Sequence, residues 1–107
     1  MFASVTTTRG PNADDMVDVA AMAGETMLGW LKDVEGFRGI VMLSSEESGR
    51  THVITFWENE EVAERSRVSR LQLRDRIVAA ASVEVEDTQP FVVAFADLGG
   101  FATIPPR

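Results

Sequence analysis

The chain contains one histidine, His52, in an apolar stretch that also holds Trp57. Histidine titrates near neutral pH, so His52 could accept a proton from a phenolic substrate. The indole of Trp57 could stack on an aromatic ligand or donate a hydrogen bond through its N–H. Each residue also has a plainer interpretation, which we favour on the sequence alone: a half-exposed strand histidine and a tryptophan that fills the core.

Two further groups of side chains could bind a ligand. Arginines recur along residues 59–82, where Arg74 and its neighbours could bind an anion or a carboxylate. Acidic residues are interleaved with them, which makes a solvated, salt-bridged helix face the default interpretation. Met16, Met27 and Trp30 have helical spacing and could line an adaptable pocket, although ordinary core is the simpler interpretation.

Composition excludes several kinds of chemistry. The 107 residues include no cysteine, which excludes disulfides, thiolate zinc sites and a cysteine nucleophile, and a single histidine predicts no metal site. A net charge of −7 argues against nucleic acids and anionic membranes as partners. The start of the chain lacks a signal-peptide pattern, and no apolar run is long enough to span a membrane. We therefore expect a cytoplasmic protein.

Alternation, helical spacing and turn residues predict the order of elements. They predict a strand over 2–8, a helix over 16–34, a hairpin of strands over 37–45 and 51–57, a helix over 59–82, and an extended region over 83–87 and 91–96 interrupted by Pro90. Asn12 or Asp14 would cap the first helix and Asn59 the second. This is an α+β, ferredoxin-like β-α-β-β-α-β order with a four-stranded antiparallel sheet. Residues 1–97 are expected to form one domain, and 98–107 a tail.

Neither face of the predicted sheet is polar. In the strand over 51–57, Ile54 and Phe56 point to one face while Val53 and Trp57 point to the other. An antiparallel sheet with one solvated face should alternate between apolar and polar residues, and two helices can cover only one face. We therefore predict a symmetric homodimer in which two sheets pack face to face.

Several stretches together resemble the antibiotic biosynthesis monooxygenase-like family: GFRGIVML, THVITFWENEEVAERS, LRDRIVAAAS and FVVAF. The most specific piece is FWENE at 56–60, where a strand leads into a helix, preceded by Gly36 and Phe37. The resemblance extends from Met1 to about Asp97. It implies a dimeric α+β barrel.

The activities implied by the resemblance include cofactor-free oxidation of aromatic polyketides and haem degradation. The haem-degrading pattern has an Asn on the first strand, and a Trp followed by a His on the second helix. Here the first strand, MFASVTTT, contains no Asn, and the helix over 59–82 contains neither Trp nor His. Haem degradation is therefore not expected.

For the cofactor-free oxygenases, the resemblance implies an apolar pocket between sheet and helices, with a few polar groups that orient a phenol and no bound cofactor. We predict catalytic roles for His52, which would assist deprotonation, and for Asn59; Asn59 or Arg38 would orient a substrate oxygen. The predicted ligand contacts are Arg38, Trp57, Trp30 and Arg74.

Two hypotheses about function follow. The first is a small dimeric oxidoreductase that oxidises an apolar or aromatic small molecule with molecular oxygen. The alternative is a non-catalytic dimeric barrel that binds a ligand or serves as an accessory subunit, because no catalytic set of the family matches residue by residue. Fold alone does not decide between them.

Overall fold

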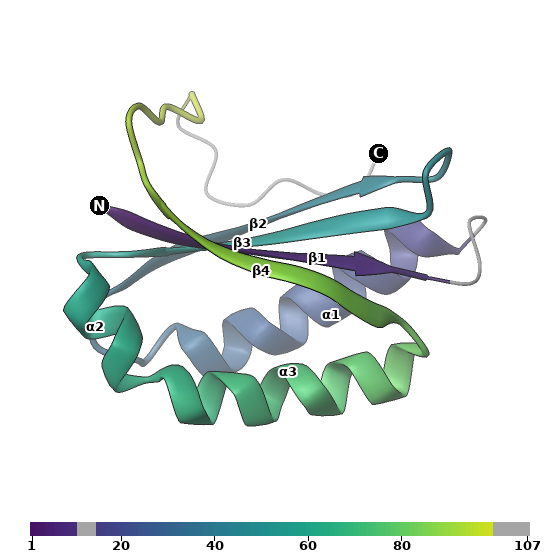
Figure 1. Cartoon of the computed structure of the whole chain (residues 1–107), viewed down its shortest axis with the longest axis horizontal. Helices are drawn as coiled ribbons and strands as arrows, with labels where there is room; N and C mark the ends of the chain where they lie inside the picture. The colour runs from purple at the N-terminus through teal and green to yellow at the C-terminus, as the bar shows by residue number, and fades with distance from the viewer. Residues whose placement is uncertain (11–14, 100–107) are drawn as a thin grey trace.

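The computed structural model describes residues 1–10 and 15–99. The proposed caps Asn12 and Asp14, and the tail beyond Gly99, lie outside the described residues. The elements are β1 (Phe2–Arg9), α1 (Met16–Leu31), β2 (Phe37–Ser45), β3 (Arg50–Trp57), α2 (Glu60–Arg65), α3 (Arg67–Ala81) and β4 (Glu84–Val92) (Figure 1).

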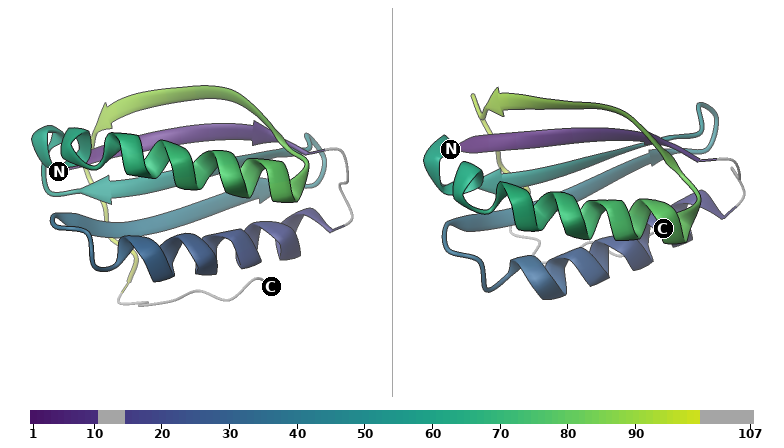
Figure 2. Two further views of the ribbon diagram at one scale, coloured as in Figure 1. Left: turned by 90° about the horizontal axis from the view of Figure 1, so that it is seen from below. Right: turned by 60° about the horizontal axis from the view of Figure 1, so that its bottom comes forward.

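The four strands form one antiparallel sheet in the order β2-β3-β1-β4. The helices lie together on one face of this sheet (Figures 1 and 2). The α+β, ferredoxin-like arrangement predicted from the sequence is therefore confirmed. None of the described helices is long and apolar enough to cross a membrane.

The β2–β3 hairpin agrees closely with the prediction because its turn chemistry is specific. Gly49 has a φ of 72°, a left-handed conformation that glycine adopts without steric cost. Asn59 caps the helix that follows the hairpin, since its Oδ1 accepts a hydrogen bond of 2.9 Å from the Val62 N–H. The first helix ends at Leu31, before the predicted residue 34, because the chain turns there through a Val34 N–H to Leu31 carbonyl bond.

The single helix predicted over 59–82 is wrong: the chain forms α2 and α3, separated at Ser66. The hydroxyl of Ser66 donates to the Ala63 carbonyl at 3.2 Å, and Arg70 Nη2 donates to the same carbonyl at 2.7 Å. Side chains thus satisfy a backbone acceptor that a continuous helix would have used itself.

The last strand also differs from the prediction. β4 runs without interruption through Pro90, and the strand predicted over 91–96 ends at Val92. Pro90 is tolerated because β4 is an edge strand. Phe2 is the partner of Val92 in the sheet and the Val93 N–H bonds to the carbonyl of Met1, so β4 ends where its neighbouring strand begins.

The core lies at the end of the sheet where β3 leads into α2. Trp57 is completely buried there and packs with Leu31, Val62 and Ala63. Gly36 lets the chain pass over this cluster, because a Cβ at that position would collide with the side chain of Val62. This packing fixes where the helical layer begins, and therefore positions α3 over the sheet.

The face of the sheet that points away from the helices is apolar along its centre. The strand registers place Val41, Ile54 and Val5 side by side in one row across β2, β3 and β1. Leu43 and Phe91, also on this face, are 53% and 48% exposed. The described residues of a single chain leave these side chains partly open to solvent.

Candidate ligand cavity

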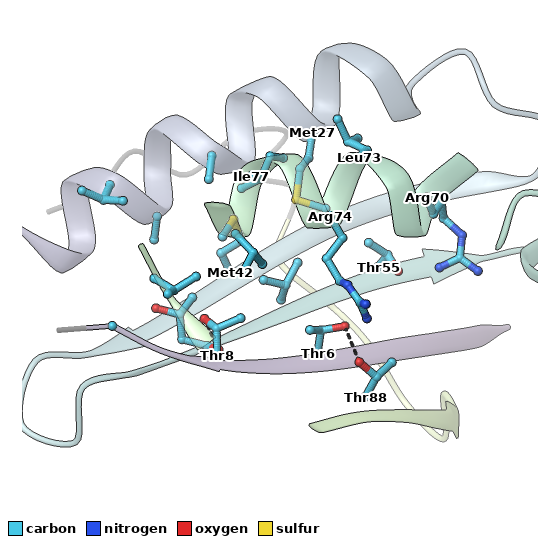
Figure 3. A pocket seen from close by; sticks show the side chains of 18 of the residues that line it. Thr6, Thr8, Met27, Met42, Thr55, Arg70, Leu73, Arg74, Ile77 and Thr88 are labelled. Atoms are coloured by element: carbon cyan, nitrogen blue, oxygen red, sulfur yellow. Dashed lines mark hydrogen bonds between the residues drawn. The ribbon is translucent and has the colours of Figure 1, made fainter. Parts of the chain in front are cut away.

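A cavity of about 430 Å³ lies between the sheet and the two long helices (Figure 3). Cavities of roughly 300–1,000 Å³ are typical of small-molecule sites. Its helical walls come from α1 and α3 and are mostly apolar, with Met27, Leu73 and Ile77 among them. α3 spans the cavity without packing closely on the strands beneath it, and this leaves the space open.

The sheet supplies most of the hydroxyl groups that line the cavity. Because side chains alternate along a strand, Ser4, Thr6 and Thr8 of β1 all point to the helical side. Thr51 and Thr55 of β3 line the same wall. The strand side of the cavity therefore combines hydroxyl groups with the apolar Met42 and Val53, and it faces mostly apolar helices.

Some of these hydroxyls already have partners. Trp57 Nε1 donates to Thr55 Oγ1 at 3.0 Å, and the hydroxyls of Ser44 and Thr51 bond at 2.8 Å. Thr6 and Thr88, on neighbouring strands, share a longer bond of 3.2 Å. The Thr6–Thr88 pair is the more easily opened by a ligand, since O–H···O bonds are usually about 2.7–2.8 Å long.

Two arginines of α3 reach the cavity, and their roles differ. Arg70 lies 4.8 Å above the ring of Trp57 and donates to Ser66 Oγ and to the Ala63 carbonyl. Burial lowers the pKa of the Arg70 guanidinium, while nearby Glu64 acts in the opposite direction. The donors of Arg70 are therefore used within the protein, where they link α3 to the end of α2 and to the core.

Arg74 extends from α3 across the cavity toward Thr6 and Thr88 (Figure 3). Its Nε is buried and has no hydrogen-bond partner among the described residues. Its Nη2 donates to Asp75 Oδ1 at 3.2 Å, and the Asp75 side chain is 70% exposed. A buried N–H without an acceptor is unfavourable, so this guanidinium is suited to receive an acceptor from a ligand.

Of the six predicted site residues, Arg74 is the one that lines this cavity. Trp57 is in the core at the end of the sheet. Trp30 is 38% exposed and lies beside a shallow depression between α1 and α3. Arg38 is exposed and pairs with Glu58 at 3.5 Å.

The two predicted catalytic residues lie elsewhere. His52 is on the opposite face of the sheet, where its Nδ1 hydrogen-bonds to Thr7 Oγ1 at 2.9 Å. Asn59 uses its amide oxygen to cap α2. The structure brings neither side chain into the cavity, and their catalytic roles stay predictions.

The hydroxyl groups on the strand side are functional candidates beyond the six predicted residues. The stretch FASVTTT predicts a strand, and its alternate residues Ser4, Thr6 and Thr8 share one face of it. Period-two spacing of hydroxyl residues in a strand covered by helices was the available signal. Thr88 comes from a distant part of the sequence and had no such signal.

The sequence matches no protein-family model and no curated protein. Solved structures do match the fold. A protein of Deinococcus radiodurans proposed to be an antibiotic biosynthesis monooxygenase has a TM-score of 0.66 at 11% identity, over 91% of this chain and 96% of its own.

Two Streptomyces structures are similar at the same level. The monooxygenase from the gene ActVA-Orf6 of Streptomyces coelicolor, in complex with nanaomycin D, has a TM-score of 0.66 at 15% identity, covering 91% and 90% of the two chains. SnoaB, a cofactor-independent oxygenase of Streptomyces nogalater, has a TM-score of 0.63 at 12% identity, covering 89% and 94%. The chain therefore has the fold of the antibiotic biosynthesis monooxygenase-like proteins, as the sequence resemblance implied.

Proposed function

We propose that this protein binds an apolar or aromatic small molecule in the cavity between the sheet and α3, and oxidises it with molecular oxygen without a bound cofactor. The observation that carries the proposal is the cavity itself: about 430 Å³, apolar on the helical side and hydroxyl-lined on the strand side. The same fold in the cofactor-independent oxygenase SnoaB supports the choice of reaction.

The reaction would convert a ring CH₂ between two aromatic rings into a carbonyl. One atom of O₂ enters the product, the other leaves as water, and the substrate supplies the electrons. Such a substrate reacts after losing a proton, and the resulting oxyanion would accept hydrogen bonds from hydroxyl groups on the strand side of the cavity. Cavity walls that are largely apolar would keep water from this anion and strengthen the interaction.

The test is oxygen uptake with an anthrone, compared with uptake by heat-denatured protein at the same concentration. We expect uptake above that control and a product one carbonyl oxygen richer. The sequence-based prediction for His52 is tested in the same assay, because His52→Gln should then depress turnover strongly. Unchanged turnover would remove His52 from the mechanism.

A second candidate is a non-catalytic binding or accessory protein of the same fold. It is favoured by the ionisable side chains among the described residues that line the cavity, which are Asp15, Arg70 and Arg74. None of these is a histidine, the residue that most often serves as a general base. Ligand binding without oxygen uptake would select this candidate.

We also propose that two copies associate through the apolar sheet face that the helices leave open. The row formed by Val41, Ile54 and Val5, with the partly exposed Leu43 and Phe91, supports this proposal. Native mass spectrometry of freshly purified protein would report the oligomeric state and any retained ligand in one measurement.

A further inference from the structure

Among the described residues, the guanidinium of Arg74 has an acceptor for its Nη2 in Asp75 and none for its Nε. Its Nε is buried with no partner among the described residues, and its contact with Asp75 is made to a carboxylate that is mostly in solvent. Arg70, the other arginine at the cavity, differs because its Nε and Nη2 both have acceptors. In the part of the chain that the structure describes, Arg74 is therefore a cavity cation with an N–H donor still available to a ligand.

Two further donors lie where Arg74 points. The hydroxyls of Thr6 and Thr88 are on adjacent strands, β1 and β4, and bond to each other at 3.2 Å (Figure 3). A hydroxyl hydrogen rotates freely, so both groups can turn to donate to an oxygen placed between them and Arg74. Arg74, Thr6 and Thr88 together form what we call the oxyanion clamp.

The oxyanion clamp favours a carboxylate over a neutral polar group. Nε and an Nη of one guanidinium form a planar fork that matches the two oxygens of a carboxylate. Hydrogen bonds to a charged acceptor are about twice as strong as neutral ones. The remaining walls, including Met27, Leu73 and Ile77, are apolar and suit a ring system.

We propose that the ligand of this cavity is an aromatic carboxylate, with its rings between α1 and α3 and its carboxylate held by the oxyanion clamp. This inference rests on the proposed function in so far as the cavity must bind a small molecule. Beyond that, it specifies that the ligand is negatively charged and names the residues that bind its charged group.

The test compares two fluorescent probes with one ring system, anthracene-2-carboxylate and its methyl ester. Both are titrated against the full-length protein, and each Kd is obtained from the change in emission. We expect the carboxylate to bind about tenfold more tightly than the ester, since a charge-assisted hydrogen bond is worth roughly one such factor or more.

Variants assign the preference to the oxyanion clamp. Arg74→Gln should raise the Kd of the carboxylate alone and so remove the tenfold preference, leaving the Kd values of the two probes within about twofold of each other. Thr6→Val with Thr88→Val should remove part of the preference. Arg76→Gln is the matched control, because Arg76 is on the same helix, is exposed and lines the shallow depression beside Trp30. It changes the net charge equally and should leave the preference intact.

The outcomes separate the two proposals. Equal affinity for carboxylate and ester in the unmodified protein would overturn the oxyanion clamp and leave ligand binding in the cavity standing. A preference lost equally in Arg74→Gln and Arg76→Gln would also overturn it, because overall charge would then be the cause. Failure of both probes to bind, while thermal melting shows all variants folded, would count against the proposed function as well.

Discussion

Trp57 shows how one polar atom is accommodated in the core. Its side chain is completely buried, and its Nε1 donates to Thr55 Oγ1 at 3.0 Å. Phe37 packs edge-on against the same ring, with centroids 5.5 Å apart, and Arg70 lies over it. The sequence-based preference for a core role agrees with this position, because an indole held so completely has no face left for a ligand.

We expect Thr55→Val to destabilise the protein by about 1–3 kcal/mol, because it leaves the buried indole N–H without an acceptor. Urea unfolding followed by tryptophan fluorescence measures the change. The same substitution at Thr26, which is exposed on α1, is the control and should alter the free energy of unfolding much less. Equal effects at the two positions would contradict the assigned role of the Thr55 hydroxyl.

Glu86 should make stability depend on acid pH. Arg50 donates to its Oε1 at 2.9 Å, and this bond holds the pKa of Glu86 below its ordinary value of 4.5. A carboxyl with a lowered folded pKa stabilises the protein above its unfolded pKa, and this contribution disappears as pH falls through the folded pKa.

The unmodified protein should therefore be more stable than Glu86→Gln near neutral pH. This difference in stability should shrink as pH falls below about 4.5. Thermal melting at a series of pH values measures it. Arg50→Gln should give a similar profile, because it removes the main cause of the pKa change. A gap that widened in acid would show that the sign is wrong.

α1 carries two glycines that look equivalent in sequence and differ in the structure. A Cβ on Gly24 would lie 2.8 Å from Met42 Sδ, whereas one on Gly29 would meet nothing within 4 Å. Met42 lines the cavity, so Gly24 lets α1 approach the sheet and leaves room for that thioether.

Gly29→Ala should stabilise the protein by about 1 kcal/mol through helix propensity alone. Gly24→Ala should gain less, because Met42 must move, and should also weaken binding of an aromatic probe by reducing the cavity. Chemical denaturation and probe titration of the two variants measure these effects. Equal gains in stability with unchanged probe affinity would show that Gly24 does not shape the cavity.

The parts of the fold that were predicted correctly depend on local signals. The hairpin of β2 and β3 has a specific turn and β-branched strands, so its bounds followed from the sequence. The break at Ser66 depends on Arg70 reaching back to the Ala63 carbonyl, and the end of β4 depends on where β1 begins. Both are tertiary contacts, which hydrophobic periodicity and secondary-structure propensity cannot predict.

The candidate site was less predictable than the fold for the same reason. Arg74 was among several arginines on one helix, and nothing in their spacing separates the one whose Nε is buried without a partner. Thr6 and Thr88 meet only because β1 and β4 pair. Residues that are far apart in the sequence line this cavity together, so the site can be identified only once the strand pairing is known.

The whole molecule is expected to be a dimer. We predict that Ile54→Lys, at the centre of the open sheet face, yields monomers, because a lysine there cannot be desolvated against a second sheet. Sedimentation velocity at micromolar concentration should give twice the 11.7 kDa chain mass for the unmodified protein and the single mass for the variant. Val68→Lys, at a position on α3 that is 71% exposed, should remain dimeric. A monomeric unmodified protein would refute the two-sheet arrangement.

Both rims of the sheet are irregular. The pairing of β2 shifts register between Phe37 and Gly39, and that of β4 shifts opposite Thr7 and Thr8, while Pro90 removes one backbone donor from β4. An unbroken rim would offer hydrogen bonds to the rim of another molecule, and such addition has no natural end. Irregular rims discourage the strand-by-strand addition that leads to fibres. Association through the open sheet face would then end at two copies, because each copy has one such face.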